Sequence, residues 1–251
     1  MADRPQRVLI LGGTAEAAAL ARHLDGDRRY LPTTSLAGRT RRPAPIAGAV
    51  RTGGFGGADG LADYLRSAAV DLLVDATHPY AATISRNAAD AADRTGVSRL
   101  ILLRPPWRWV ESDRWIEVDD TAAAADALAD LGDHVFLSIG RQTLAPFAAL
   151  PRHWFLVRLI DPPAAPVALP RHRVVLGRGP FDADAEARLF AEHRIDVIVS
   201  KNSGGDATYG KIAAARRLGL PVIVIARPPP PAGDVVDSID AAMAWLAAQV
   251  G

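Results

Sequence analysis

Short apolar runs alternate with segments of helical periodicity along most of the chain. The first run, residues 8–11, is continuous, as expected of a strand buried on both faces of a parallel sheet, and it ends at two glycines. Ala17, Leu20, Ala21 and Leu24 then recur at the spacing of a helix that packs back on the sheet. The opening of the chain therefore predicts a strand, a glycine turn and a helix.

The same alternation continues to the end of the sequence. Further strands are predicted at 30–35, 50–52, 72–76, 100–103, 135–139, 154–160, 174–176, 195–200 and 221–226. Helices are predicted between them, among others at 82–94, 121–131 and 182–193, and a last helix at 239–250 follows the final strand. Alternating strands and helices imply parallel sheets with right-handed crossovers.

About ten strands suit two sheets of about five better than one very wide sheet. We therefore predict an α/β protein made of two Rossmann-like, doubly wound domains with a cleft between them. The expected boundary separates residues 1–118 from residues 119–251, because strand, turn and helix units begin again at that point.

Composition narrows the class of protein. The net charge is +1, so no global field draws the chain to nucleic acid or to a membrane, and neither is an expected partner. The absence of cysteine excludes disulfides and thiolate metal sites, and no metal is predicted. No apolar run is long enough to span a bilayer, and no signal-peptide pattern opens the chain. We expect a soluble, cytoplasmic protein.

The turn after the first strand is the first candidate site. A glycine turn that leads into a helix presents free N–H groups and the positive end of the helix dipole to an anion. Gly12 and Gly13 open the turn, while Thr14 and Ala17 occupy the later glycine positions of a strict dinucleotide fingerprint. Two interpretations remain open, a nucleotide site and an ordinary tight turn.

The end of the second strand bears on which nucleotide would bind. An acidic residue there would hold the ribose 2′-OH of NAD, and none is present. Hydroxyl groups and guanidinium groups stand in its place, among them Ser35 and Arg39. This favours NADPH over NADH if a cofactor binds, and the alternative is a solvated basic loop.

Two other loops follow strands in the first half. Gly53, Gly54, Gly56 and Gly57 permit close approach of the backbone to a ligand, or else they form a mobile lid. His78 follows the strand at 72–76, where open α/β sheets place ligands. It could contact a ligand, donate a proton, or serve structure alone.

Cations also follow strands in both halves. A solvated charge is the plain interpretation of any one of them, but parallel strands bring their carboxyl ends to one edge, and Arg suits bidentate carboxylate binding. We expect at least three of five cations to converge on a rim for a ligand with several carboxylates: Arg39, Arg104, Arg141, Arg178 and Lys201. The mixed Arg and Trp segment at 104–109 is interpreted as a hinge or a wall against an aromatic ligand.

At this point the chain resembles a known family, precorrin-6A reductase of cobalamin biosynthesis. The likeness runs from Val8 to about Ala226. The motifs that carry it occur in order: LGGTAEA at 11–17, SLAGRT at 35–40, GGFGG at 53–57, DATHPY at 75–80, GRQ at 140–142, RGPF at 178–181 and KNSGG at 201–205. Tyr80 stands where a phenylalanine is as common.

The resemblance implies two Rossmann-like domains, NADPH as hydride donor and a precorrin macrocycle as substrate, reduced to precorrin-6B. It also implies hand-over of the product to the next enzyme of the pathway. Residues expected at the cofactor are Gly12, Gly13, Thr14, Ala15, Ser35, Arg39, Thr40, Gly54, Thr77, His78 and Tyr80. Residues expected at the substrate are Arg39, Arg104, Arg141, Arg178, Lys201 and Ser203. His78 is the candidate catalytic acid, with water and a substrate carboxyl as alternatives.

Three other functions remain open beside this one. The first is reduction of cobalt-precorrin-6A, whose chelated metal the protein need not touch. The second is a two-domain transferase that uses a nucleotide sugar, and the third is a nucleotide-binding regulator without turnover.

Overall fold

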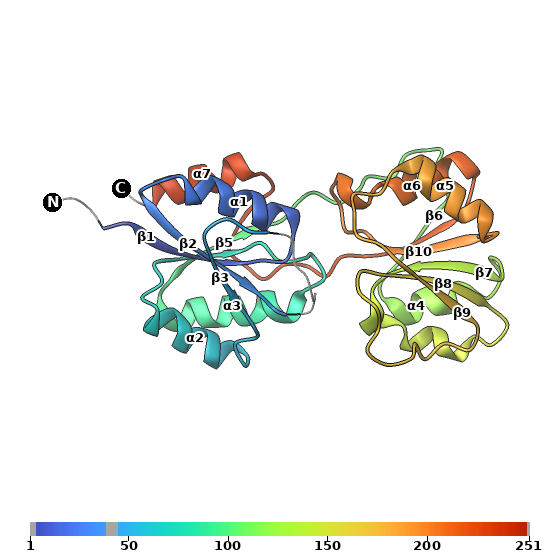
Figure 1. The fold of residues 1–251 in the computed structure, drawn as a ribbon, viewed down its shortest axis with the longest axis horizontal. Helices are drawn as coiled ribbons and strands as arrows, with labels where there is room; N and C mark the ends of the chain where they lie inside the picture. Colours follow the sequence, from blue (N-terminus) through green and yellow to red (C-terminus); the bar gives the residue numbers. More distant parts are fainter. Residues whose placement is uncertain (1–3, 39–44, 250–251) are drawn as a thin grey trace. The chain divides into compact units, whose positions relative to one another are not determined.

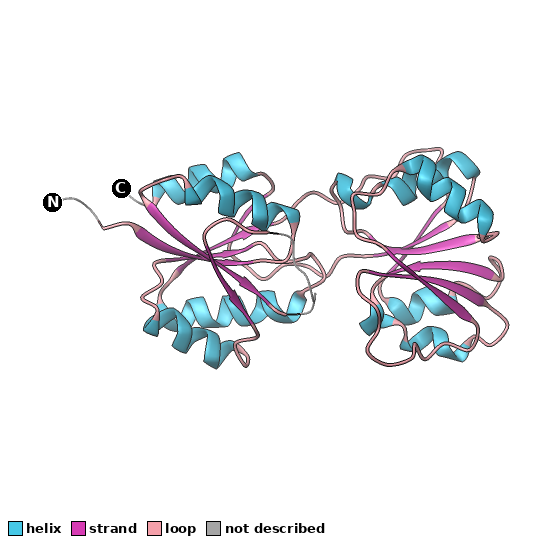
Figure 2. Cartoon of the chain, in the orientation of Figure 1, coloured by secondary structure: helices cyan, strands magenta, loops and turns pink. Residues whose placement is uncertain are grey.

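The computed structural model describes residues 4–38 and 45–249, and these form two compact units. The first unit contains the chain up to Pro105 and again from Pro228 onward, and the second contains Pro106–Arg227. In each unit a parallel sheet lies between helices on both of its faces (Figures 1 and 2). The predicted α/β class with two Rossmann-like domains is confirmed.

The sheet of the first unit has the strand order β12-β5-β4-β1-β2-β3. All of its neighbouring strands pair in parallel. The strands are β1 (Gln6–Leu11), β2 (Tyr30–Leu36), β3 (Ala49–Thr52), β4 (Leu72–Asp75), β5 (Ser98–Leu102) and β12 (Asp234–Val236). The helices are α1 (Ala15–Asp25), α2 (Ala58–Ser67), α3 (Ala82–Thr95) and α7 (Ile239–Ala248).

Alternation along β1 builds the two cores of this unit. Val8 and Ile10 point to one face, where they pack with Leu20 and Leu24 of α1 and with Leu246 of α7. Leu9 and Leu11 point to the other face, which α2 and α3 cover. A strand buried on both faces needs no polar side, which explains the continuous apolar run in the sequence.

The second unit repeats this arrangement with the strand order β6-β11-β10-β7-β8-β9, again entirely parallel. Its strands are β6 (Trp115–Val118), β7 (His134–Ser138), β8 (Trp154–Leu159), β9 (His172–Leu176), β10 (Val197–Lys201) and β11 (Val222–Ile225). The helices are α4 (Thr121–Asp126), α5 (Ala183–Glu192) and α6 (Gly210–Leu218), with short 3-10 helices η1 (Arg141–Thr143), η2 (Ala145–Ala149) and η3 (Asp206–Thr208).

The compact units differ from the predicted boundary at residues 118 and 119. Two edge strands explain the difference, since β6 pairs with β11 of the second unit and β12 pairs with β5 of the first. The chain therefore enters the second unit after Pro105 and returns to the first after Arg227. Each sheet has six strands in the described part of the chain, one more than the predicted five. Helix α4 is shorter than predicted and ends at Asp126.

Candidate functional site

The strand order places a switch point in the first unit between β1 and β4. From β1 the chain continues to β2 and β3 on one side, while β4 and β5 lie on the other. Ligands of open α/β sheets bind outside the carboxyl ends of the strands at such a point. The loops that meet there are Gly12–Thr14, after β1, and Ala76–Tyr80, after β4. The predicted cofactor residues of these loops are thereby brought to one edge of one sheet.

The two glycines of the first loop are needed for different structural reasons. A Cβ on Gly12 would lie 2.7 Å from the Thr34 Cγ2 atom, so this position demands close packing against β2. Gly13 has a backbone φ of +107°, which residues with a side chain rarely adopt. Apart from its chain neighbours, no heavy atom of the described residues lies within 4 Å of where its Cβ would stand. The backbone of Gly13 therefore borders open space at the start of α1.

Thr14 joins the two loops of the switch point. It is the N-cap of α1, where its Oγ1 atom accepts a hydrogen bond from the Ala17 N–H at 3.1 Å. The same hydroxyl donates to the Ala76 carbonyl at 2.7 Å. Ala15 is the first residue of the helix. One hydroxyl thus caps the helix and ties it to the chain that leaves β4.

A buried carboxylate, Asp75, shapes the loop after β4. Its Oδ1 atom accepts hydrogen bonds from the backbone N–H of Thr77 at 3.1 Å and from the Thr77 hydroxyl at 2.7 Å. Its Oδ2 atom is buried and has no hydrogen-bond partner among the residues that the structure describes. Sequence reasoning quoted Asp75 only as part of a motif and missed this role, although an acid at the end of a buried strand was a usable signal.

His78 and Tyr80 lie further along this loop, with ring centroids 5.7 Å apart. The His78 side chain is exposed, and its Nδ1 atom lies 3.3 Å from the backbone nitrogen of Tyr80. A backbone N–H can only donate, so Nδ1 is the acceptor and Nε2 carries the proton of the neutral ring.

Arg51, at the end of β3, was not predicted as a site residue. Its Nη1 atom donates to the Ser35 hydroxyl oxygen at 3.0 Å and to the Gly53 carbonyl at 2.9 Å, and Nη2 donates to the Gly54 carbonyl at 3.4 Å. The guanidinium lies 3.8 Å from the centroid of the Phe55 ring. Arg51 therefore holds the glycine loop beside β2. Arg51 pairs in register with Ser35 on β2, so the pairing of β2 with β3 identifies this contact. No motif in the sequence marks Arg51.

The remaining predicted residues of the first unit fall into two groups. Arg39 and Thr40 lie outside the described residues. Arg104 follows β5 and forms an ion pair with Glu16, in the first turn of α1, at 2.7 Å. The charge of Arg104 thus balances an acid that stands one turn from the glycine loop.

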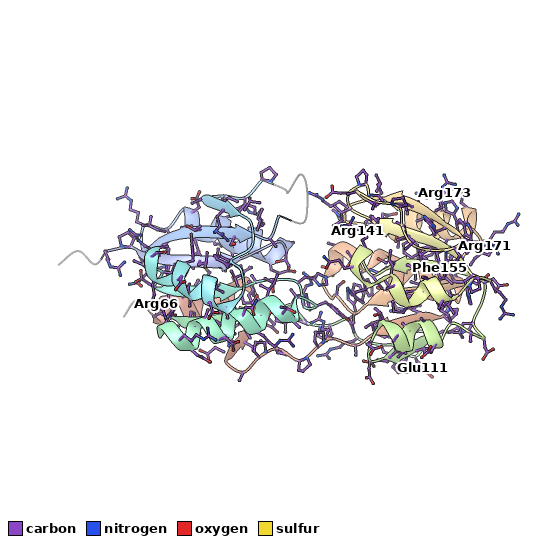
Figure 3. All side chains as sticks on the ribbon, turned by 90° about the horizontal axis from the view of Figure 1, so that it is seen from below. Arg66, Glu111, Arg141, Phe155, Arg171 and Arg173 are labelled. Atoms are coloured by element: carbon purple, nitrogen blue, oxygen red, sulfur yellow. The ribbon has the colours of Figure 1, made fainter. Side chains whose placement is uncertain are left out.

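In the second unit the switch point lies between β7 and β10. Arg141 follows β7 in η1, Lys201 ends β10, and Arg178 follows β9. Because the sheet is parallel, all three belong to its carboxyl edge. Figure 3 shows Arg141 at the opposite end of this unit from Arg171 and Arg173, which lie at the start of β9. We call Arg141, Arg178 and Lys201 the cationic edge.

Ser203 lies just beyond the cationic edge and is largely buried. Its Oγ atom lies 3.0 Å from the Thr208 Oγ1 atom, so the two hydroxyls share a hydrogen bond. The predicted role of Ser203 as a substrate contact therefore involves a hydroxyl that is already engaged within the loop.

Buried charges support the loop that carries Arg178. Arg158 on β8 forms a two-point ion pair with Glu186 on α5, with both distances at 2.7 Å. The Arg158 guanidinium lies 4.0 Å from the centroid of the Phe181 ring. Lys211 on α6 is buried nearby, where burial lowers the pKa of its ammonium to about 7 against the raising effect of Glu186.

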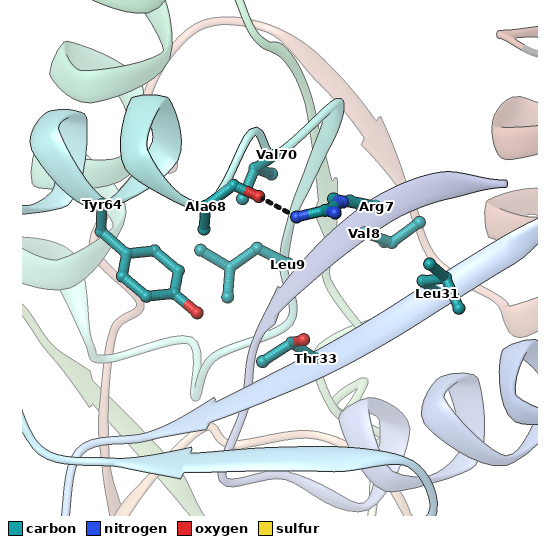
Figure 4. Close-up of a pocket in the computed structure, with 8 residues that line it drawn as sticks. All are labelled: Arg7, Val8, Leu9, Leu31, Thr33, Tyr64, Ala68 and Val70. Carbon is teal, nitrogen blue, oxygen red and sulfur yellow. Dashed lines mark hydrogen bonds between the residues drawn. The ribbon is translucent and has the colours of Figure 1, made fainter. Parts of the chain in front are cut away.

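A pocket of about 210 Å³ lies in the first unit, beside the amino-terminal parts of β1 and β2 (Figure 4). Arg7, Val8 and Leu31 come from the amino-terminal parts of β1 and β2, and the Arg7 Nη1 atom donates to the Ala68 carbonyl at 2.9 Å. None of the predicted site residues that the structure describes lines this pocket. We therefore assign it no part in the site.

Two searches of residues 4–38 and 45–249 gave negative results. No group of three or more His, Cys, Asp or Glu side chains there could hold a metal ion. No helix within those ranges has the length and apolar character needed to cross a membrane.

The fold and the glycine turn define the class of protein. Two doubly wound units, the first with a glycine turn and helix N-terminus at its switch point, make this a two-domain Rossmann-like protein. The model of one family, described as precorrin-6x reductase CbiJ/CobK, matches residues 7–247. The chain belongs to the precorrin-6x reductase family, which confirms the resemblance drawn from the motifs.

Individual relatives agree with this assignment. A precorrin-6A reductase of Rhodococcus erythropolis is 53% identical over 242 residues, covering 96% of this chain and 97% of that protein. A cobalt-precorrin-6A reductase of Salmonella typhimurium is 31% identical over 258 residues, covering 96% and 97%. The solved structure of CobK precorrin-6A reductase superimposes with a TM-score of 0.92 at 45% identity and covers 97% of each chain.

Proposed function

We propose that this protein is an NADPH-dependent oxidoreductase that reduces precorrin-6A to precorrin-6B in cobalamin biosynthesis. The observation that carries the proposal is the full-length similarity to precorrin-6A reductases, in sequence and in fold. Family membership supports reductase chemistry, and the cofactor and the residue roles below are our assignments.

The metal-free macrocycle is the substrate that we favour. The relative named for precorrin-6A shares 53% identity with this chain, whereas the relative named for cobalt-precorrin-6A shares 31%. Both cover nearly the whole chain, so the difference does not come from a missing domain. It supports precorrin-6A over its cobalt complex.

The first unit fits a dinucleotide. Gly13 borders open space with a positive φ, and the start of α1 presents its N–H groups and dipole at the same place. We assign Gly12, Gly13, Thr14 and Ala15 to the diphosphate. When bound, NADPH would supply the hydride that saturates one carbon–carbon bond of the macrocycle.

NADPH is favoured over NADH by the groups beside the end of β2. No acid stands there to hold a free ribose 2′-OH, while Ser35 presents a hydroxyl and Arg51 adds a guanidinium next to it. We propose that Ser35, Gly54 and the backbone shaped by Arg51 hold the adenosine end, together with Arg39 and Thr40. A 2′-phosphate suits this set of donors.

Thr77, His78 and Tyr80 are proposed to lie at the nicotinamide end. Thr14 and Asp75 both hold the start of this loop, at Ala76 and Thr77, which favours a preformed position. His78 is exposed on this loop, which makes it a candidate to deliver the proton to the carbon next to the hydride acceptor. Water and a substrate carboxyl remain the alternatives.

The cationic edge and Ser203 are proposed to hold the macrocycle in the second unit. A precorrin carries acetate and propionate side chains, and guanidinium and ammonium groups suit carboxylates. Arg104 was expected to join them. Its ion pair with Glu16 favours a different role, namely cancelling the negative charge beside the proposed diphosphate position.

The test is a turnover assay of the purified protein with precorrin-6A or cobalt-precorrin-6A, each with NADPH or NADH, followed by nicotinamide absorbance. We expect one NADPH oxidised per precorrin-6A and much slower turnover in the other three mixtures. Faster reduction of cobalt-precorrin-6A would indicate that the protein is a cobalt-precorrin-6A reductase instead. NADPH binding without oxidation would indicate a regulator and overturn the proposal.

A further inference from the structure

Asn202, between Lys201 and Ser203, makes an unusual pair of hydrogen bonds. Its Oδ1 atom accepts from the backbone N–H of Trp107 at 2.8 Å, and its Nδ2 atom donates to the backbone carbonyl of Trp107 at 3.2 Å. A side-chain amide carries one acceptor and two donors, so it can satisfy both main-chain groups of one residue. Asn202 thus pairs with Trp107 as a neighbouring strand would.

The main chain of Asn202 reaches a second segment. Its carbonyl accepts from the Arg227 Nε atom at 2.6 Å, and its N–H donates to the Ile225 carbonyl at 3.2 Å. Trp107 lies two residues after the chain enters the second unit, and Arg227 is the last residue before it leaves. Residues at both points where the chain passes between the units are therefore hydrogen-bonded to Asn202.

Trp107 is itself firmly held within the second unit. Its indole Nε1 atom donates to the Gly205 carbonyl at 2.8 Å, and only 8% of the residue is exposed. The Lys211 Nζ atom lies 4.6 Å from the centroid of its ring. The loop from Lys201 to Gly205 is consequently fastened to Trp107 near its start and at its end.

We propose that Asn202 is a positioning residue that fixes Lys201 and Ser203 for the carboxylates of the macrocycle. Its anchors are the two segments through which the chain passes between the units. The proposal rests on the proposed function, because it assumes that Lys201 and Ser203 contact substrate. Asn202 itself contacts neither ligand and acts through its neighbours.

Asparagine is the residue type that this position requires. Alanine would leave the Trp107 N–H and carbonyl without partners in a part-buried place. Aspartate would keep an acceptor for the N–H but would put a carboxylate oxygen against the carbonyl. Both substitutions should free the loop while leaving the first unit untouched.

The experiment compares Asn202→Ala and Asn202→Asp with Trp107→Phe as the matched control. The control keeps both backbone groups that Asn202 holds, and it removes the indole bond to Gly205 together with part of the buried ring beside Lys211. For each protein we would measure the Kd of NADPH, the Kd of precorrin-6A, kcat, and hydrogen exchange at the Trp107 amide without ligands.

We expect both Asn202 variants to bind precorrin-6A about tenfold more weakly, with the Kd of NADPH within about twofold of wild type. Exchange at the Trp107 amide should rise in both, and Trp107→Phe should show smaller changes. Unchanged precorrin-6A binding with faster exchange would overturn the positioning role, and so would equal loss of both ligands. Failure of the wild-type protein to reduce precorrin-6A would overturn the proposed function. The exchange measurement needs no ligand, so it reports on the hydrogen bonds between Asn202 and Trp107 independently of that function.

Discussion

The Thr14 hydroxyl donates a hydrogen bond to the carbonyl of Ala76, with the two oxygens 2.7 Å apart. This bond joins the glycine turn after β1 to the loop after β4, which are 62 residues apart in the sequence. Because Thr14 also caps α1, the helix N-terminus and both loops of the switch point are held as one piece. This part of the proposed cofactor site is therefore held in place by β1, β4 and α1.

Replacing Thr14 by valine tests this relationship. Valine keeps the shape but leaves the Ala17 N–H and the Ala76 carbonyl without their partner, so we expect a loss of about 1–2 kcal/mol in the free energy of unfolding. NADPH should also bind more weakly. Thr14→Ser keeps the hydroxyl and should behave nearly as wild type. Denaturant unfolding and NADPH titration give the two readings, and equal behaviour of the two variants would contradict the account.

Arg51 offers a second test at the adenosine end. Lysine cannot reproduce a planar fork that reaches one hydroxyl and two carbonyls while it stacks on Phe55. We expect Arg51→Lys to raise the Kd of NADPH about tenfold or more and to leave the Kd of precorrin-6A unchanged. Arg66→Lys is the control, since Arg66 is exposed on α2 and pairs with Asp63. Similar titration curves for both variants would count against the proposed role of Arg51.

Because burial lowers the pKa of Lys211, we expect the free energy of unfolding to depend on pH. Its pKa is about 7 in the folded protein and has its ordinary value of 10.5 in the unfolded chain. Between these values the unfolded state binds more protons, so the free energy of unfolding should rise with pH, by at most about 1.4 kcal/mol per pH unit. Below pH 7 Lys211 is protonated in both the folded and the unfolded state, so the full cost of burying its charge lowers the free energy of unfolding.

The comparison is between wild type and Lys211→Met, which keeps the length of the side chain without its charge. The variant should show a flatter dependence of unfolding free energy on pH between about 7 and 10. The groups that face Lys211 are Glu186, which favours its charged form, and Arg158, which opposes it. Equal slopes for the two proteins in denaturant titrations would show that Lys211 does not titrate in this range.

Much of the fold was predictable from the sequence because most strands are buried on both faces. Runs such as Val8–Leu11 are then continuously apolar and easy to detect. The two missed strands are short and lie at the edges of the sheets, where β12 is largely exposed and β6 only partly buried. Their loss from the prediction also misplaced the boundary between the units, since β12 and α7 return to the first sheet.

The place of the candidate residues in the fold was predictable where a motif follows a strand, and less so where a contact is made across the sheet. The strand, turn and helix pattern predicted that Gly13 and Thr14 lie between a strand and a helix, which they do. Arg51 acts through Ser35 on the neighbouring strand, and Asn202 acts through Trp107, 95 residues away. Contacts of this kind depend on the order of the strands in the sheet and on where the chain passes between the units. The periodicity of a single strand carries no information about either.

The central claim assigns one ligand to each unit, and two variants test it together. Gly13→Val puts a β-branched side chain at a φ of +107° into the open space beside α1, so it should abolish tight NADPH binding. Lys201→Ala removes one member of the cationic edge and should weaken precorrin-6A binding. Arg173→Ala, at the other end of the second sheet, is the control (Figure 3).

The measurement is calorimetric titration of each variant with NADPH and, separately, with precorrin-6A. The account predicts that Gly13→Val loses NADPH binding but keeps precorrin-6A binding, that Lys201→Ala does the reverse, and that Arg173→Ala keeps both. Loss of both ligands to the same extent in Gly13→Val and in Lys201→Ala would contradict it.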